Sequence, residues 1–345
     1  EARLAEELAR VAPPGLSRAF YTDNGSGSIE VAVKMCVQGQ AQRGQPRRTR
    51  FVALDGAFHG DTIGAASLGG VELFRRPFAS VLFDCVRAPS PDERGFARAF
   101  EHVEALLARE GDTIAGVFVE PLVQGAAGMR VYDPAHLRAL REACSRAGAW
   151  LVFDEVFTGY GRTGRMWASD HAGVTPDLMC LGKVFASIVP MGATLATDEV
   201  YRAFSGGKDR ALWYGHTFCG SPLGAALALE VLAIYRDEDV VGQAARKGRR
   251  LAAAFERMTA IPGVVRGRSL GMIGALDLAI DADYTGELGW RVYREGLARG
   301  AYLRPLGDTV YLCPPLVIDD ADLDELLAVF EASVRAALRG PGAGE

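Results

Sequence analysis

Four short, mostly apolar runs recur in the first two hundred positions of the chain, separated by stretches with helical spacing. They cover residues 49–56, 114–122, 150–157 and 178–182. Their apolar residues follow one another without alternation, which is typical of strands buried on both faces of a parallel sheet. The pattern therefore predicts an α/β fold in which a mostly parallel sheet is flanked by helices.

Helical patterns fill the intervals between these strands. One helix is predicted from Asp133, which can cap it, to Gly148, which can end it, with Pro134 at its first position. A second helix is predicted after the GSGS turn at residues 25–28, because apolar residues recur at helical spacing from Ile29 onward. Both helices thus begin at recognisable N-terminal signals.

The pattern changes near residue 236. A long apolar helix is expected from about Ser221, and it leads into a charged stretch, RDEDVVGQAARKGRR, at 236–250. Short strands, turns and a final amphipathic helix at 321–338 follow. We therefore expect a large domain at 1–235 and a small C-terminal α+β domain at 236–345.

Composition narrows the class of protein. The chain has 345 residues, 49% of them hydrophobic and 23% charged, with a formal net charge of −5. An acidic balance disfavours nucleic-acid binding, and no apolar run is long enough to span a membrane. The charged, helical first fifteen residues differ from a secretory signal. The six cysteines form no CxxC pair and the five histidines are scattered, so we expect a soluble cytoplasmic enzyme without a metal site.

The turn at residues 25–28 is a candidate anion site. Small side chains, a hydroxyl group and free amide groups at a helix N-terminus suit a phosphate. The sequence matches neither of the glycine-rich patterns of nucleotide-binding loops. From the residues alone, a non-nucleotide phosphate and a simple helix cap both stay open.

Asp154 and Lys183 each follow an apolar strand, at the edge where open α/β sheets bind their ligands. A cap or ion pair for Asp154 and a solvated end for Lys183 are the structural alternatives. Taken with the candidate phosphate turn, however, a lysine amine, a carboxylate and amide groups match the three polar ends of pyridoxal phosphate. Glu155 is expected to face the opposite side of its strand.

Longer motifs resemble those of the class III aminotransferases, which are pyridoxal-phosphate enzymes of fold type I. The motifs are FYTDNGSGSIEVAVKM, FHGDTIGAASLGG, VEPLVQGAAGM, VFDEVFTGYGRTG, LGK, GHTFCGSPLGAALA and LRPLGDTVYLCPPL. VFDEVFTGYGRTG followed by LGK is specific for the class, whereas FHGDT and the last motif resemble its biotin-pathway branch. That branch implies transamination of 8-amino-7-oxononanoate to 7,8-diaminononanoate, with S-adenosylmethionine or lysine as the amino donor.

The resemblance also implies roles for individual residues. Lys183 would form the Schiff base with the cofactor, and Asp154 would hold its pyridine nitrogen. The remaining cofactor-binding residues would be Gly25, Ser26, Phe58 stacked on the ring, and Thr217 of the partner subunit. The residues expected at the substrate are Asp61, Arg162, Gly215, Arg304 and Tyr311, with Arg304 on the carboxylate. The family implies a homodimer with shared active sites that acts on small molecules.

Some positions depart from the family pattern. Phe58 stands where the biotin branch usually has tyrosine, Leu306 replaces an aromatic residue, and VFASIVPMG follows Lys183 in place of a glycine-rich continuation. The family also carries an N-terminal segment with further substrate aromatics, and we expect that segment to be missing here.

Structural roles stay open for several of these residues when the resemblance is set aside. Phe58 would then be a core residue, His59 a turn residue and Arg304 a solvated strand end. Arg162 with Asp61 would form an ordinary ion pair, and Glu120 would pair with an arginine. Two other functions are also open: a class III aminotransferase for ornithine, 4-aminobutyrate or another ω-amino compound, and a non-catalytic aminotransferase-like domain.

Overall fold

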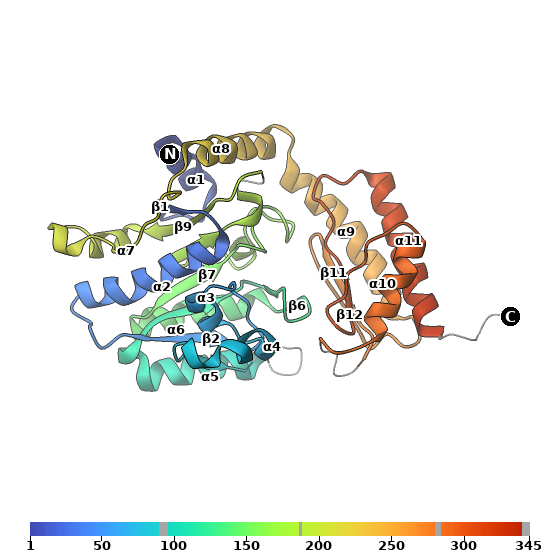
Figure 1. The fold of residues 1–345 in the computed structure, drawn as a ribbon, viewed down its shortest axis with the longest axis horizontal. Coiled ribbons are helices and arrows are strands. Elements are labelled where there is room, and N and C mark those ends of the chain that lie inside the picture. Colours follow the sequence, from blue (N-terminus) through green and yellow to red (C-terminus); the bar gives the residue numbers. More distant parts are fainter. Residues whose placement is uncertain (90–95, 186–187, 280–283, 340–345) are drawn as a thin grey trace. The chain divides into compact units, whose positions relative to one another are not determined.

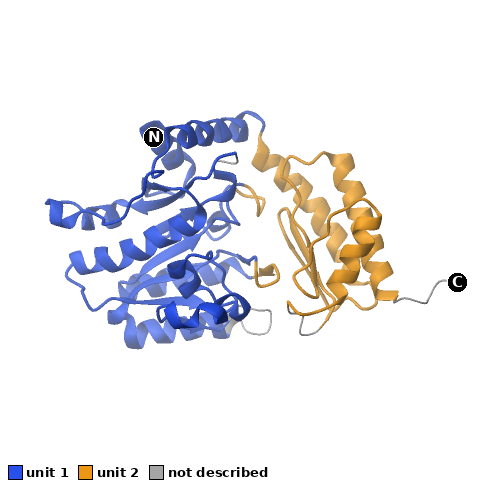
Figure 2. Ribbon diagram, viewed as in Figure 1, with its two compact units in different colours: residues 1–125, 132–160, 166–238 blue, residues 126–131, 161–165, 239–345 orange. Residues whose placement is uncertain are grey.

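The computed structural model describes residues 1–89, 96–185, 188–279 and 284–339. The chain divides into two compact units (Figure 2). Unit 1 comprises residues 1–125, 132–160 and 166–238, and unit 2 comprises residues 126–131, 161–165 and 239–345. Each unit has its own sheet and its own apolar core.

In the described part of unit 1, seven strands form one sheet in the order β1-β9-β8-β7-β4-β2-β3 (Figure 1). Strand β9 is antiparallel to β1 and β8, and the neighbours from β8 to β3 are parallel. The strands are β1 Leu16–Thr22, β2 Arg50–Leu54, β3 Val86–Ala88, β4 Ile114–Val119, β7 Trp150–Asp154, β8 Leu178–Leu181 and β9 Gly192–Thr197. The four predicted runs are β2, β4, β7 and β8, so the predicted α/β fold with a mostly parallel sheet is confirmed.

Helices cover both faces of this sheet. Along β8, Leu178 and Cys180 belong to the core beneath α2, whereas Met179 and Leu181 belong to the core beneath α1 and α8. Figure 1 shows α1 beside α8. The helices of unit 1 are α1 Ala2–Val11, α2 Gly25–Gln42, α3 Ile63–Leu68, α4 Glu72–Arg75, α5 Phe96–Glu110, α6 Pro134–Ala147, α7 Asp198–Ala203 and α8 Pro222–Asp237. None of the described helices combines the length and apolar character that a membrane span needs.

The predicted N-terminal signals are present at both helices. The Asp133 side chain accepts a hydrogen bond from the amide of Ala135 at 2.6 Å, and Gly148 ends α6 with a φ of +70°. Helix α2 begins at Gly25, inside the predicted turn. Short-range chemistry therefore determines where these helices start and stop.

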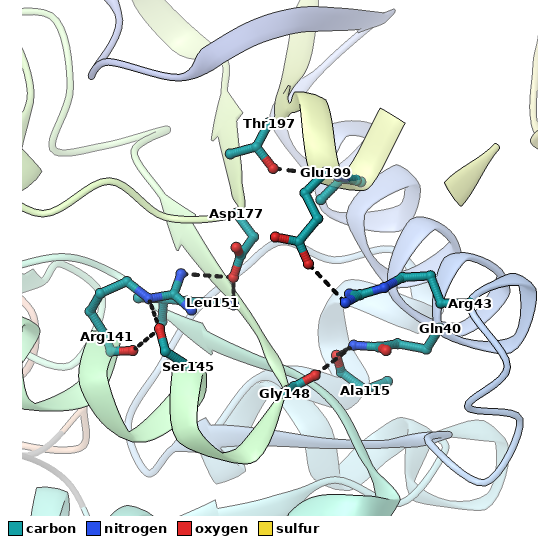
Figure 3. Close-up of polar contacts among 11 residues, drawn as sticks. Gln40, Arg43, Ala115, Arg141, Ser145, Gly148, Leu151, Asp177, Thr197 and Glu199 are labelled. Atoms are coloured by element: carbon teal, nitrogen blue, oxygen red, sulfur yellow. Dashed lines mark hydrogen bonds and ion pairs between the residues drawn. The ribbon is translucent and has the colours of Figure 1, made fainter. Parts of the chain in front are cut away.

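The amino ends of β7 and β8 are joined by partly buried polar contacts (Figure 3). Asp177, which precedes β8, accepts hydrogen bonds from the amide of Leu151 and from Arg141, both at 2.7 Å. Gln40 on α2 donates to the carbonyl of Gly148 at 3.1 Å. These contacts fix the register of the two strands, and therefore also the position of their carboxyl ends.

Unit 2 consists of a small antiparallel sheet and helices that pack on it. Its sheet has the order β10-β11-β12, with strands β10 Arg266–Leu270, β11 Ile273–Asp277 and β12 Thr309–Leu312. Its helices are α9 Val240–Thr259, α10 Leu288–Ala298 and α11 Asp320–Arg339. Two further short strands are β5 Val123–Gln124, which belongs to unit 1, and β6 Arg130–Val131, which belongs to unit 2. The final amphipathic helix was predicted, and α11 confirms it.

Helix α9 was not predicted from the sequence. We interpreted 236–250 only as a charged stretch, but residues 236 and 237 end α8, and residues 240–250 begin a twenty-residue helix on which Arg246 and Arg249 are exposed. Leu251, Phe255 and Met258 continue the helix beyond that stretch and are buried in the core of unit 2. The apolar stripe is interrupted by charge at its beginning, which concealed the helical period.

Candidate active site

The candidate phosphate turn joins the carboxyl end of β1 to helix α2. The Asn24 side chain caps the helix by accepting a hydrogen bond from the amide of Gly27 at 2.7 Å. Gly25 and Ser26 occupy the first two helical positions, where amide groups have no partner within the helix and the helix dipole is positive. This turn therefore presents the donors that a phosphate requires.

Close packing brings three other loops against this turn. A Cβ atom placed on Gly60 would lie 2.1 Å from the Ser26 hydroxyl oxygen, and one on Gly182 would lie 2.9 Å from the Gly25 Cα atom. A Cβ on Gly25 would in turn lie 2.8 Å from a methyl carbon of Val156. The loops after β2, β7 and β8 therefore meet at the N-terminus of α2, and only glycine permits the approach at these positions.

Asp154 is the last residue of β7 and is 5% exposed. Its Oδ1 atom accepts a hydrogen bond from the amide of Val156 at 3.1 Å, and its Oδ2 atom lies 2.7 Å from Nδ1 of His59. Glu155 is also buried, but it accepts from Thr158 and from the amides of Ala168 and Ser169. The two adjacent carboxylates thus serve separate networks, in agreement with their expected opposite directions.

Lys183 begins a short 3₁₀ helix directly after β8. Cys180 pairs with Asp154 across the two strands, so Lys183 lies three positions beyond the partner of that carboxylate. Its side chain is exposed, and its Nζ atom lies 5.4 Å from the centroid of the Phe157 ring. Its φ of +51° falls in the left-handed region, a conformation uncommon for non-glycine residues and frequent at functional sites.

Phe58 and His59 follow β2 at the same edge of the sheet. The half-buried Phe58 ring contacts the ring of Phe74 edge-on, at 5.7 Å between centroids. Phe58 also lines a hollow of about 250 Å³ together with Asp61, whose own side chain is exposed. Loops from β1, β2, β7 and β8 therefore bring five of the candidate cofactor residues to one edge of the sheet: Gly25, Ser26, Phe58, Asp154 and Lys183.

His59 and Glu120 are the buried residues whose importance the sequence analysis missed. Glu120 accepts hydrogen bonds from the amides of Phe58 and Gly125, both at 3.0 Å, rather than pairing with an arginine. Burial raises the pKa of Glu120 to about 7, with the charge of Asp154 adding to the effect and that of His59 opposing it. One signal in the sequence could have identified them: both residues follow strands at the edge of the sheet that binds ligands.

Neighbouring charges also shift the pKa of His59. Burial lowers its pKa, but the hydrogen bond and charge of Asp154, together with the charge of Glu120, outweigh burial and raise it. A role as a turn residue, which the sequence left open for His59, therefore does not account for its contact with Asp154. Its Nε2 atom is buried and has no hydrogen-bond partner among the described residues.

The other predicted residues lie on other segments of the chain. Gly215 and Thr217 lie on an exposed segment of unit 1, outside the hydrogen-bond network of Asp154. Arg162 belongs to unit 2 and donates to the carbonyls of Met272 and Pro314, at 3.3 and 2.7 Å.

Arg304 and Tyr311 also belong to unit 2, and they contact each other. Burial raises the pKa of Tyr311, while the nearby charge of Arg304 and its hydrogen bond to the hydroxyl oppose the shift. Leu306 is buried and pairs through its backbone with Thr309. Of the VFASIVP stretch, residues 186 and 187 lie outside the described residues. Within the described residues, no three histidines, cysteines or carboxylates gather into a metal site.

Known proteins match this chain over nearly its whole length. The adenosylmethionine-8-amino-7-oxononanoate aminotransferase of Geobacter sulfurreducens is 38% identical over an alignment of 357 positions. The alignment covers 98% of this chain and 79% of that protein. The crystal structure of the enzyme of that name from Methanocaldococcus jannaschii superposes with a TM-score of 0.92 at 31% identity, covering 97% of this chain and 79% of the other.

A second solved structure extends the comparison to the cofactor. An amine transaminase from an uncultivated Pseudomonas species, in its PLP-bound form, superposes with a TM-score of 0.90 at 31% identity and covers 97% of this chain and 81% of its own. The profile of the family "Aminotransferase class-III" matches residues 1–334. The chain therefore belongs to the class III aminotransferases, enzymes that work with pyridoxal phosphate.

Proposed function

We propose that this chain transfers an amino group to 8-amino-7-oxononanoate, producing 7,8-diaminononanoate for biotin synthesis. The reaction type rests on one observation, the convergence of Lys183, Asp154 and the α2 N-terminus at one edge of the sheet. The acceptor is supported by the name of the relatives from Geobacter and Methanocaldococcus. That name also supports S-adenosylmethionine as the donor, with lysine as the alternative.

The residues of unit 1 fit pyridoxal phosphate. The amides of Gly25 and Ser26 would bind its phosphate, in the cradle where added Cβ atoms would collide. The Asp154 carboxylate would hold the pyridine nitrogen, and the Phe58 ring would stack on the cofactor ring. Lys183 would bind the aldehyde carbon covalently. Each polar end of the cofactor thus has a chemically matched group.

When bound, pyridoxal phosphate supplies an electron sink for the carbon that gains or loses the amino group. Asp154 keeps a proton on the pyridine nitrogen, because its negative charge favours the protonated ring. Lys183 must be neutral to act as a nucleophile and a base. Its freed amine takes the proton from the amine-bearing carbon of the donor, and in the second half-reaction it supplies the proton to the acceptor.

Substrate binding is assigned to Asp61, Arg162, Gly215, Arg304 and Tyr311. Arg304 is the residue we propose for the oxononanoate carboxylate, because its guanidinium is exposed and its partner Tyr311 can hold it in place. A guanidinium binds a carboxylate through two parallel hydrogen bonds, which favours a fixed orientation.

Replacing Arg304 with alanine is expected to weaken only the half-reaction with the oxo acid. A charge-assisted hydrogen bond to a carboxylate contributes about 1.5–3 kcal/mol, so affinity for that substrate should fall about 10- to 100-fold. Stopped-flow absorbance of the bound cofactor measures each half-reaction separately. Equal losses in both half-reactions would assign Arg304 a structural role instead.

We also propose a homodimer with active sites shared between subunits. Thr217 lies on an exposed segment, flanked by Trp213 at 67% and Phe218 at 64% exposure. Large apolar side chains with this exposure favour burial against a second protein surface. In this arrangement, the Thr217 hydroxyl donates to the cofactor phosphate of the partner subunit.

Mixing two inactive variants tests the shared site. Thr217→Asp should empty the site that this residue serves, because a carboxylate repels the phosphate, and Lys183→Ala disables the site of its own chain. In a mixed dimer, one site then carries both defects and the other carries neither. After exchange of equal amounts, about a quarter of the wild-type activity should return, since half of the dimers are mixed and each has one working site. A mixture that stays inactive after confirmed exchange would exclude sharing through Thr217.

The proposal includes a cytoplasmic location, which the buried thiols of Cys36, Cys144 and Cys180 support because persistent thiols are typical of reducing compartments. One observation favours a second candidate function, an ω-amine transaminase. The amine transaminase from Pseudomonas superposes about as well as the enzyme from Methanocaldococcus, at the same sequence identity. The choice between the two therefore depends on the acceptor.

A further inference from the structure

Residues 210–217, which we call the Thr217 segment, lie along one face of helix α2. Three side chains on that face bind the backbone of the segment: Lys34, Gln38 and Gln42. They are four residues apart and therefore follow one another along a single side of the helix. The function proposed above gave none of them a role, so their contacts need an explanation of their own.

Gln38 is the central contact. Its Nε2 atom donates to the carbonyl of Ala211 at 2.7 Å, and its Oε1 atom accepts from the amide of Trp213 at 3.3 Å. The Lys34 ammonium donates to the carbonyl of Trp213 at 3.1 Å. In an extended chain, the carbonyl of one residue and the amide two residues later point to the same side. The side-chain amide of Gln38 therefore binds the segment as a neighbouring strand would.

The repeat of the helix matches the repeat of the segment. Residues four apart on a helix are separated by about 6 Å along its axis, and two residues of an extended chain span about 6.6 Å. Lys34 and Gln38 accordingly bind carbonyls two residues apart, those of Trp213 and Ala211. Regular helix geometry thus lets successive side chains hold successive parts of the segment.

The beginning of the segment is fixed from both sides. The Gln42 side chain donates to the carbonyl of Arg210 at 3.1 Å. The Arg210 guanidinium donates in turn to the carbonyls of Gln42 and Ala203, at 3.1 and 2.6 Å. These two carbonyls belong to the last residues of α2 and α7, where the helix dipole favours a cation. The segment therefore starts from a fixed point.

Burial alternates along the segment and determines which side chains face outward. Leu212 and Tyr214 are half-buried and pack against the core beneath α2, whereas Trp213, Gly215 and Thr217 are exposed. Because side chains of an extended chain alternate between two sides, a shift by one residue would exchange the exposed residues for the half-buried ones. The contacts from α2 oppose such a shift.

We infer that Lys34, Gln38 and Gln42 are positioning residues of the shared active site: they hold the Thr217 segment where the Thr217 hydroxyl reaches the cofactor phosphate of the partner subunit. This inference rests on the proposed homodimer. Helix α2 then serves both sites of the dimer. Its N-terminus binds the phosphate of its own subunit, and its side holds the residue that binds the phosphate of the other.

The arrangement of two substitutions in a mixed dimer tests this inference. Gln38→Met keeps the length of the side chain and removes both of its hydrogen bonds, and Lys183→Ala leaves the dimer with one intact Lys183. Dimers with both substitutions on one chain, and dimers with one on each chain, are purified through two different affinity tags. The cofactor-free dimers are titrated with pyridoxal phosphate, borohydride fixes the cofactor to the intact Lys183, and mass spectrometry measures the amount fixed.

With both substitutions on one chain, we expect half-saturation at an about 10-fold higher cofactor concentration, because the intact site then depends on the loosened segment. With the substitutions on different chains, the loosened segment serves the site that has lost its lysine. That titration should agree within about twofold with that of a mixed dimer carrying Lys183→Ala alone. Gln45→Met, at an exposed position just beyond α2, is the matched control and should have no effect in either arrangement.

A general loss of helix stability would act on the chain's own phosphate turn and give a different result. Equal half-saturation in the two arrangements, or a weaker site only when the substitutions are on different chains, would overturn the inference. Lys34→Met, at an exposed side chain, provides a second variant with the same expected difference, should Gln38→Met not fold. Failure of the tagged chains to associate, or of the unsubstituted dimer to fix pyridoxal phosphate on Lys183, would instead contradict the proposed function.

Hydrogen exchange measures the positioning itself, without the cofactor. The amide of Trp213 donates to Gln38, so we expect it to exchange several-fold faster in Gln38→Met and at the wild-type rate in Gln45→Met. An unchanged exchange rate in Gln38→Met would show that Gln38 does not hold the segment.

Discussion

Replacing Lys183 with alanine is expected to reduce turnover by at least about 10³-fold, because both the covalent attachment and the proton transfer depend on its amine. Folding should be preserved, since the Lys183 side chain is exposed. The backbone at Lys183 is in the left-handed conformation, and that conformation costs alanine about as much as lysine. Steady-state kinetics and thermal unfolding of the same preparation measure the two effects.

The other lysines have different structural roles, which makes this prediction specific. Lys34 on α2 donates to the carbonyl of Trp213 at 3.1 Å, and the buried Lys247 on α9 donates to the carbonyl of Leu316 at 3.3 Å. Lys208 is exposed in a short 3₁₀ helix, so Lys208→Ala is the matched control and should keep wild-type activity.

Borohydride reduction provides the complementary test, because it fixes the bound cofactor to the lysine that holds it. Peptide mapping should then find the label on Lys183. A label on any other lysine would refute the assignment.

Replacing Asp154 with asparagine should slow the chemical step by at least about 100-fold, in the range observed when one preorganised electrostatic contact is removed from an active site. The amide has nearly the same shape as the carboxylate, so packing at the end of β7 is conserved. What is lost is the negative charge that keeps a proton on the pyridine nitrogen. Single-turnover absorbance measurements isolate this step.

Asp177→Asn is the control for loss of a partly buried carboxylate outside the candidate site. Asp177 holds the amino ends of β7 and β8 through Arg141 and the amide of Leu151 (Figure 3), so its loss should lower stability and leave the rate of the chemical step near wild type. If Asp154→Asn retained single-turnover rates within a few-fold of wild type, Asp154 would not support the electron sink.

Much of the fold was predictable because its signals are local. Buried parallel strands require continuous apolar runs, and helix ends require capping groups such as Asp133 and Gly148. Helix α9 escaped prediction because charged residues occupy its first half. Strand β9 was also not predicted, since Gly192–Thr197 has few large apolar residues and its identity depends on pairing with β1 and β8.

The candidate site was predictable to the extent that it lies at strand ends. Asp154 and Lys183 could be placed at the same edge from the order of apolar runs alone. The contact of His59 with Asp154 joins residues 95 positions apart, and no local pattern encodes such a pairing. The close packing of Gly60 on Ser26 likewise depends on tertiary structure. Sequence reasoning therefore located the chemical groups but missed what holds them.

The acceptor specificity of the second half-reaction tests the proposed function most directly. The purified chain is loaded with pyridoxal phosphate and treated with an amino donor until the visible absorbance of the bound cofactor is lost, and excess donor is removed. 8-Amino-7-oxononanoate, 2-oxoglutarate and pyruvate are then added separately. We predict that the absorbance returns fastest, by at least about 100-fold, with 8-amino-7-oxononanoate, because a site built for one substrate's polar groups discriminates strongly against compounds that leave those groups unpaired. Equal or faster recovery with 2-oxoglutarate or pyruvate would contradict the proposed function and favour another ω-aminotransferase.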